Sequence, residues 1–176
     1  MKVIFLDIDG VLNSEEFYMR EDPLSDGIID PANLVYVRRI VDETGAQLVL
    51  TSSWRRGWDK RPEKCSFEGK VINRALAKEG LVLLDKTGHA ASRPVEISGW
   101  ISQQAEKVEA FVILDDGDFH WKKYGLAPFW VQTNFEDGGL KEGHYRKAME
   151  ILDQPPKLPW WRKLLNSLDK AGEGDA

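Results

Sequence analysis

The sequence is poor in several features that would point to particular classes of protein. It contains a single cysteine, Cys65, so no internal disulfide can form and a reducing compartment is expected. No run of residues approaches the ~20 apolar residues of a membrane span, and the first apolar run is too short for a signal peptide. Basic residues are not in excess, and the formal net charge of −5 argues against a general polyanion binder. We therefore expect a cytoplasmic protein without a membrane span.

What is present is the composition of a globular protein, 42% hydrophobic and 30% charged over 176 residues. This length suits one domain, which we place at residues 1–153, and we expect a monomer. The acidic segment 14–30 is either a surface loop or a flap over the ends of the strands. Residues 154–176 begin with the Pro-rich stretch Q-P-P-K-L-P, and we predict a linker, a short amphipathic helix and a disordered tail.

The first thirteen residues, M-K-V-I-F-L-D-I-D-G-V-L-N, organise the rest of the chain. Their apolar run predicts a short buried strand that ends in two carboxylates, Asp7 and Asp9, followed by Gly10. A calcium loop would need Asx and Gly where Val11 and Leu12 stand, so that interpretation fails. Either the acids cap an ordinary turn, or one of them attacks phosphorus or binds a cation while the other transfers a proton. Gly10 would let backbone approach a ligand closely.

Strand-like and helix-like patterns alternate along the rest of the chain. Strands are predicted at 3–6, 47–50, 81–84, 111–114 and 129–132. Between them lie predicted helices, the first of which has Asp30 as its N-cap and stops at Gly45. A second helix runs through Val71 to Gly80, a third opens at Pro94, and a last one ends near residue 153. This alternation predicts a single Rossmann-like parallel sheet of about five strands with helices on both faces.

Oxygen-bearing side chains follow three of the predicted strands. They are Asp7 and Asp9 after the first strand, Thr51 and Ser52 after the second, and Asp115 and Asp116 after the fourth. Ligands of parallel sheets bind at the carboxyl ends of the strands, so these groups are expected to meet at one edge. One such strand end could arise by chance, whereas three indicate a functional site.

A basic and aromatic loop follows the second strand. It reads W-R-R-G-W-D-K-R-P-E-K, from Trp54 to Lys64, and includes Arg55 and Trp58. Interleaved rings and cations suit nucleotides or single strands, although a solvated loop is the simpler alternative. The stretch Asp85-Lys86-Thr87-Gly88 is interpreted as a turn.

The ordered set F-L-D-I-D-G-V-L, L-V-L-T-S-S-W-R and V-I-L-D-D resembles the haloacid dehalogenase (HAD) superfamily of phosphotransferases over residues 1–153. It is most similar to small members without a cap, found in nucleic-acid end repair. The resemblance implies the strand order 5-4-1-2-3 and a minimal cap.

The resemblance also implies roles for the acids. Asp7 would be the nucleophile that forms an aspartyl-phosphate, and Asp9 would protonate the leaving oxygen and then activate water. The metal would be Mg²⁺, which prefers hard oxygen ligands. Its expected ligands are Asp7, the Asp9 carbonyl and Asp116, with Asp115 binding through water or orienting its neighbours.

Further residues would bind phosphate or substrate. Thr51 would hydrogen-bond a phosphate oxygen, with Ser52 as the alternative. The basic residue that offsets the phosphate charge would be Arg93, with Lys86 as the alternative. The substrate would also meet residues of the loops: Gly10, Ser52, Trp54, Arg55, Trp58 and Lys86.

The expected function is therefore that of a Mg²⁺-dependent phosphomonoester hydrolase with an open site. Its substrate would be a phosphorylated small molecule or a nucleic-acid end, and a nucleotidase is one alternative. The other alternative is a non-catalytic module of HAD fold that binds phosphate or a partner through its tryptophan-rich surface.

Overall fold

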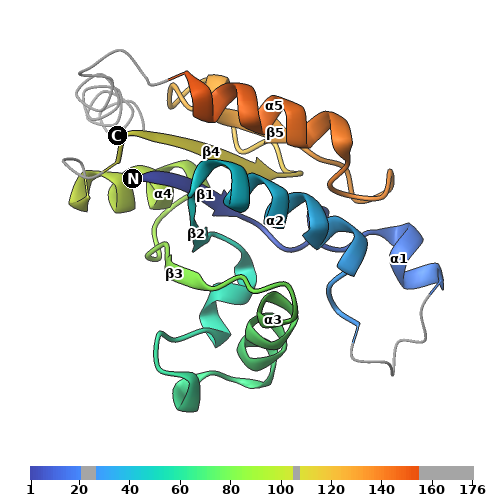
Figure 1. Cartoon of the computed structure of the whole chain (residues 1–176). Coiled ribbons are helices and arrows are strands. Elements are labelled where there is room, and N and C mark those ends of the chain that lie inside the picture. The colour runs from blue at the N-terminus through green and yellow to red at the C-terminus, as the bar shows by residue number, and fades with distance from the viewer. Residues whose placement is uncertain (21–26, 105–107, 155–176) are drawn as a thin grey trace.

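The sheet of this computed structural model, which describes residues 1–20, 27–104 and 108–154, has five parallel strands (Figure 1). Their bounds are β1 Lys2–Leu6, β2 Gln47–Leu50, β3 Leu83–Lys86, β4 Ala110–Asp115 and β5 Trp130–Gln132. The spatial order is β3-β2-β1-β4-β5, so β1 is central. The prediction of a parallel Rossmann-like sheet in this order is confirmed.

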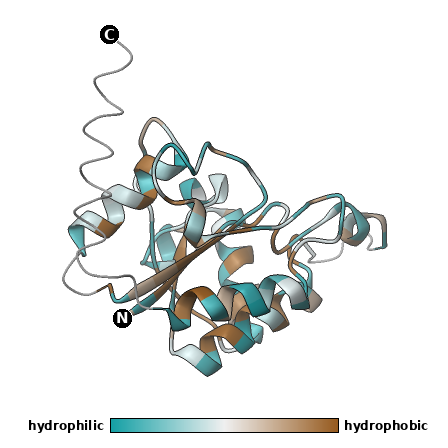
Figure 2. Ribbon diagram, turned by 90° about the horizontal axis from the view of Figure 1, so that it is seen from above, coloured by the Kyte–Doolittle hydropathy of each residue, from teal (hydrophilic) through white to brown (hydrophobic). Residues whose placement is uncertain are grey.

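Helices cover both faces of the sheet, as predicted. Alternate residues of β1 point to opposite faces: Ile4 and Leu6 belong to one apolar cluster, and Val3 and Phe5 to the other. The first cluster takes in α2 Pro31–Thr44, α3 Phe67–Lys78 and α5 Glu142–Asp153, and the second takes in α4 Arg93–Gln103. Figure 2 shows the hydrophobic strands running through the middle of the molecule, between helices on either side. The central strand β1 is therefore buried on both faces.

The helix that follows the acidic segment has the ends that its sequence predicts. The side chain of Asp30 accepts a hydrogen bond from the Ala32 N–H, and Pro31 occupies the first turn. Gly45 ends α2 in the left-handed conformation, with φ of 67°. Both signals are confirmed.

Strand β3 lies two residues later than the sequence pattern indicated. Gly80 has a φ of 68°, and the backbone N–H of Leu81 donates to the carbonyl of Leu76, which closes the end of α3. Leu81 therefore belongs to the helix end, and the strand comprises Leu83–Lys86. The interpretation of 85–88 as a turn is wrong at its first two residues, because Asp85 and Lys86 pair with β2.

The segment 14–30 is not wholly irregular. It begins with a short helix, α1 Glu15–Arg20, which lies beyond the carboxyl ends of the strands (Figure 1). Tyr18 contacts Phe135 with ring centroids 6.2 Å apart, and the Glu15 N–H donates to the Phe135 carbonyl. Residues 21–26 lie outside the described residues, so the flap remains a prediction.

The predicted linker, amphipathic helix and tail fall at residues 154–176, of which the structure describes only Gln154. Within the described ranges, no helix has the length and apolar character needed to cross a membrane.

Candidate active site

The carboxyl ends of β1 and β4 bring three acids together. Leu6 and Leu114 are partners in the sheet, and the backbone N–H of Asp7 continues this pairing with a 3.0 Å bond to the Leu114 carbonyl. Asp115 is the last residue of β4 and Asp116 follows it. One carboxylate oxygen from each of Asp7, Asp115 and Asp116 lies within 4.8 Å of the other two. We call these three residues the acid cluster.

Arg93, the first residue of α4, bridges two members of the acid cluster. Its Nη1 donates to Oδ2 of Asp7 at 2.9 Å and to Oδ2 of Asp115 at 2.6 Å. The guanidinium also lies over the Phe119 ring, 4.9 Å from its centroid, and only 10% of the side chain is exposed. Such short bonds from a cation to two buried carboxylates are strong and fix the positions of all three groups.

Lys86 lies elsewhere. Its Nζ donates to the backbone carbonyls of Arg55 and Trp58, which fixes the loop after β2. Of the two candidate cations, it is therefore Arg93 that contacts Asp7, and Lys86 that supports the loop.

One guanidinium does not neutralise three carboxylates. Burial and the charge of Asp7 raise the pKa of Asp115 to about 8, despite the opposing effect of Arg93. Burial, and then Asp7, also raise the pKa of Asp116. Burial by itself would lower the pKa of Arg93, but Asp7 and Asp115 outweigh it, and the net shift is upward. The cluster thus favours the arrival of a further positive charge.

The acid cluster fits Mg²⁺ by the chemistry of its donors. All three side chains offer hard oxygen ligands, and their negative charge exceeds what Arg93 balances. Gly10 belongs to this site for a steric reason. A Cβ on Gly10, whose φ is 69°, would lie 2.2 Å from Oδ2 of Asp116, so glycine lets Asp116 approach the turn after β1 this closely.

Asp9 stands apart from the cluster and is exposed. Each of its carboxylate oxygens accepts a hydrogen bond: Oδ1 from Nδ2 of Asn13 at 3.0 Å, and Oδ2 from the indole Nε1 of Trp54 at 2.8 Å. Asn13 is fully buried, accepts a bond from the Gly10 N–H, and also donates to the Tyr18 hydroxyl. Asn13 was not predicted as a site residue, although an amide so close to paired acids could have signalled a loop-closing role.

The hydroxyl groups after β2 have different partners. Thr51 is buried, and its Oγ1 accepts a 3.4 Å bond from Oγ1 of Thr87. The Ser52 hydroxyl caps the following 3-10 helix η1 Ser53–Gly57, accepting from the Trp54 N–H at 3.3 Å. Thr87 was missed because β3 was predicted to end at Leu84. In its true register, Thr87 follows the strand directly and lies beside Thr51.

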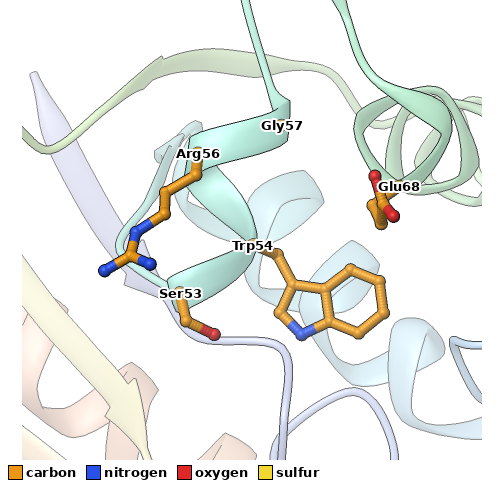
Figure 3. Close-up of a pocket in the computed structure, with 5 residues that line it drawn as sticks. All are labelled: Ser53, Trp54, Arg56, Gly57 and Glu68. Carbon is orange, nitrogen blue, oxygen red and sulfur yellow. The ribbon is translucent and has the colours of Figure 1, made fainter.

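The basic, aromatic loop places its side chains in two different ways. Arg55 and Trp58 are buried: Arg55 pairs with Glu96, and the indole of Trp58 donates to Asn73 at 2.8 Å. Both side chains are engaged in interior contacts, which does not favour the predicted stacking of Trp58 on a base or binding of a phosphate by Arg55. Trp54 is half-buried and lines a surface cavity of about 260 Å³, together with Ser53, Arg56, Gly57 and Glu68 (Figure 3).

A parallel sheet of this order, with an acid cluster at the ends of β1 and β4, is the arrangement of a HAD-like domain. Comparison with known families agrees. Residues 3–144 match the model for the HAD domain in Swiss Army Knife RNA repair proteins, and the chain belongs to this family. No curated protein and no solved structure matched the chain.

Proposed function

We propose that this protein is a Mg²⁺-dependent phosphomonoester hydrolase that removes phosphate from nucleic-acid ends, with Asp7 as nucleophile. The observation that carries the proposal is the acid cluster crossed by Arg93 at the carboxyl end of the central strand. Structural ion pairs are seldom built from three carboxylates and one cation, because the excess charge costs stability unless a ligand offsets it.

The reaction would take place in two displacements. A carboxylate oxygen of Asp7 attacks phosphorus, the bond from phosphorus to the leaving oxygen breaks, and Asp9 gives that oxygen its proton. Water then attacks the aspartyl-phosphate, Asp9 takes a proton from it, and inorganic phosphate leaves with the Asp7 carboxylate restored. Two carboxylates in different surroundings suit this division, because Asp7 is buried and fixed while Asp9 faces solvent.

Two further groups would orient the phosphoryl group. Arg93 would bind the phosphoryl oxygens and keep Asp7 directed at phosphorus. A planar guanidinium matches the geometry of phosphate well. Thr51, with its neighbour Thr87, would donate a hydrogen bond to a phosphoryl oxygen.

Asp7, Asp116 and the Asp9 carbonyl would hold the Mg²⁺ ion, and Asp115 would bind it through water or orient its neighbours. When bound, the ion would offset the charge of the carboxylates and the phosphate, so that the two can approach each other.

The family and the surface together favour nucleic-acid ends as the substrate class. The matching family is described by its occurrence in RNA repair proteins. Trp54, which holds Asp9, also lines a cavity with Arg56, and this ring and cation are of the kind that suit a base and a backbone phosphate.

The test compares release of phosphate from 5′- and 3′-phosphorylated RNA oligonucleotides and from sugar phosphates, with Mg²⁺ and with EDTA. We expect Mg²⁺-dependent release, with a higher kcat/KM on the oligonucleotides. The matched control is Asp7→Asn, which keeps the side-chain shape. No release from any phosphomonoester by the wild-type protein would instead leave a non-catalytic module of HAD fold.

A further inference from the structure

We propose that Trp54 has two roles at once. Its ring forms the wall of a pocket that binds the nucleoside of the leaving group, and its indole N–H holds Asp9, the acid that protonates that group. This inference rests on the proposed function. It assigns to Trp54 a positioning role and to the adjoining cavity a ligand class.

The first observation is the way in which Asp9 is held. Asp9 follows the buried end of β1 and is itself exposed, although its neighbours in the turn are buried, so its carboxylate would rotate if it had no partners. Trp54 fixes one of its oxygens and Asn13 the other. Each carboxylate oxygen has two lone pairs, so these bonds leave room for the proton that Asp9 must transfer. A carboxylate fixed in this way delivers its proton along one direction.

The second observation is that Trp54 itself is fixed. It lies in η1, which Ser52 caps, and it packs against the apolar cluster that contains β1. The neighbouring Arg55 anchors η1 from below through its buried pair with Glu96. Trp54 is therefore a rigid donor, and the loop that carries it does not have to be ordered by the substrate.

The third observation is the surface cavity that Trp54 lines together with Ser53, Arg56, Gly57 and Glu68. Figure 3 shows Trp54 and Arg56 projecting from opposite sides of η1, with Ser53 between them and Glu68 on the neighbouring helix. Its volume of about 260 Å³ is near the small end of ligand sites, which suits one nucleoside better than a duplex.

The lining matches the parts of a nucleotide chain. The indole offers a face for a base, and Arg56, which is exposed, offers a cation to the next backbone phosphate. The hydrogen bond from Ser66 lowers the pKa of Glu68, so an anionic acceptor is present for a base N–H or a ribose hydroxyl.

The two roles of Trp54 can be separated by two substitutions. Trp54→Phe keeps a ring but removes the N–H, and Trp54→Ala removes both. The substrates are a 5′- or 3′-phosphorylated RNA trinucleotide, whose alkoxide needs a proton to leave, and p-nitrophenyl phosphate, whose phenolate leaves without one. Thermal unfolding of each variant serves as the folding control. If Trp54→Ala does not fold, Trp54→Leu replaces it, since leucine keeps the contact with the core.

We expect Trp54→Phe to lower kcat on the trinucleotide ~10-fold, a part of what general acid catalysis contributes, while its KM stays within ~2-fold. On p-nitrophenyl phosphate its kcat/KM, which reports the first displacement, should change less than ~2-fold. The value of kcat on either substrate also includes the second displacement, in which Asp9 activates water. Trp54→Ala should in addition raise KM for the trinucleotide ~10-fold, as expected for the loss of one stacked base. Arg56→Ala should raise the same KM ~3-fold or more. The matched charge control Lys78→Ala, at the far end of α3, should leave it unchanged.

Equal losses of kcat/KM on both substrates, or no loss, in Trp54→Phe would overturn the positioning role. Equal KM values for Trp54→Phe and Trp54→Ala would overturn the nucleoside pocket. Both results differ from failure of the proposed function, in which the wild-type protein turns over neither substrate with Mg²⁺ and the inference falls with it.

Discussion

The acid cluster differs in almost every physical respect from the neighbouring group of Asp9, Asn13 and Trp54, which we call the rim. Asp7 and Asp115 are buried and bonded to the buried cation of Arg93. Burial also raises the pKa of Asp115. Asp9 is exposed and held by the neutral donors Asn13 and Trp54. Charge interactions are strong in the first environment and screened in the second. In the proposed mechanism, the buried region would hold the charged intermediate, and Asp9 would exchange protons with water and the leaving group.

This difference predicts that changes in the acid cluster affect both stability and every substrate, whereas changes at the rim affect activity alone and depend on the substrate.

The largest effect is expected for Asp7→Asn. Without the attacking carboxylate, kcat should fall by ~10³-fold or more on all phosphomonoesters. The melting temperature should stay level or rise, because one of the repelling charges near Asp115 is gone while the amide oxygen can still accept from Arg93. Steady-state kinetics and thermal unfolding measure the two effects. Turnover near the wild-type rate would refute the assignment of Asp7 as nucleophile.

Arg93→Ala should come next. Its loss leaves Asp7 and Asp115 without their cation, and we expect a loss of stability of about 3 kcal/mol. Activity should fall ~10²-fold, since a phosphoryl contact is lost as well. Mg²⁺ should restore much of the melting temperature but little of the activity.

The control for Arg93→Ala is Lys86→Ala, which removes a cation that contacts the loop after β2. If Arg93→Ala and Lys86→Ala lost activity to the same extent at equal stability, the contact of Arg93 with Asp7 would not explain its effect on activity.

A third comparison lies within the acid cluster. Asp116→Asn should raise the Mg²⁺ concentration for half-maximal activity ~10-fold, and Asp115→Asn should raise it less, because Asp115 is wholly buried and already bonded to Arg93. Titration of activity with Mg²⁺ measures both. The opposite order would exchange the roles of the two acids.

The smallest effect is expected for Trp58→Phe. This change removes the hydrogen bond to Asn73 and should cost about 1 kcal/mol of stability. Because Trp58 is buried away from the cavity, kcat and KM on oligonucleotides should not change. A loss of activity comparable to that of Trp54→Phe would mean that the loop after β2 acts on substrate as a unit.

Much of the fold could be predicted because its signals are local. The apolar runs of β1, β2 and β4, the Asp30 cap and Gly45 each determine their own surroundings. β3 was misplaced because the apolar run L-V-L-L begins in the closing turn of α3, and only the left-handed Gly80 assigns Leu81 to the helix end.

The site was predictable where residues directly follow strands, and less so where side chains cross between elements. The acids after β1 and β4 were named because parallel strands end at one edge. That Trp54 would face Asp9 while Trp58 entered the core could not be read from the loop, because both are tryptophans of the same basic loop. The difference comes from the partners that tertiary packing supplies: Asp9 for one indole and Asn73 for the other.

The most direct test of the account is to find where phosphate is carried during the reaction. The protein is mixed with Mg²⁺ and a phosphorylated RNA oligonucleotide, quenched in acid within one turnover, reduced with borohydride and mapped by mass spectrometry. Asp9→Asn, in which the second displacement should be slowed, is treated in parallel. We predict that the reduced acyl phosphate is found at Asp7, and more of it in Asp9→Asn. Phosphate release without modification of Asp7 in either protein, or modification at another acid, would contradict the assignment of Asp7 as the nucleophile.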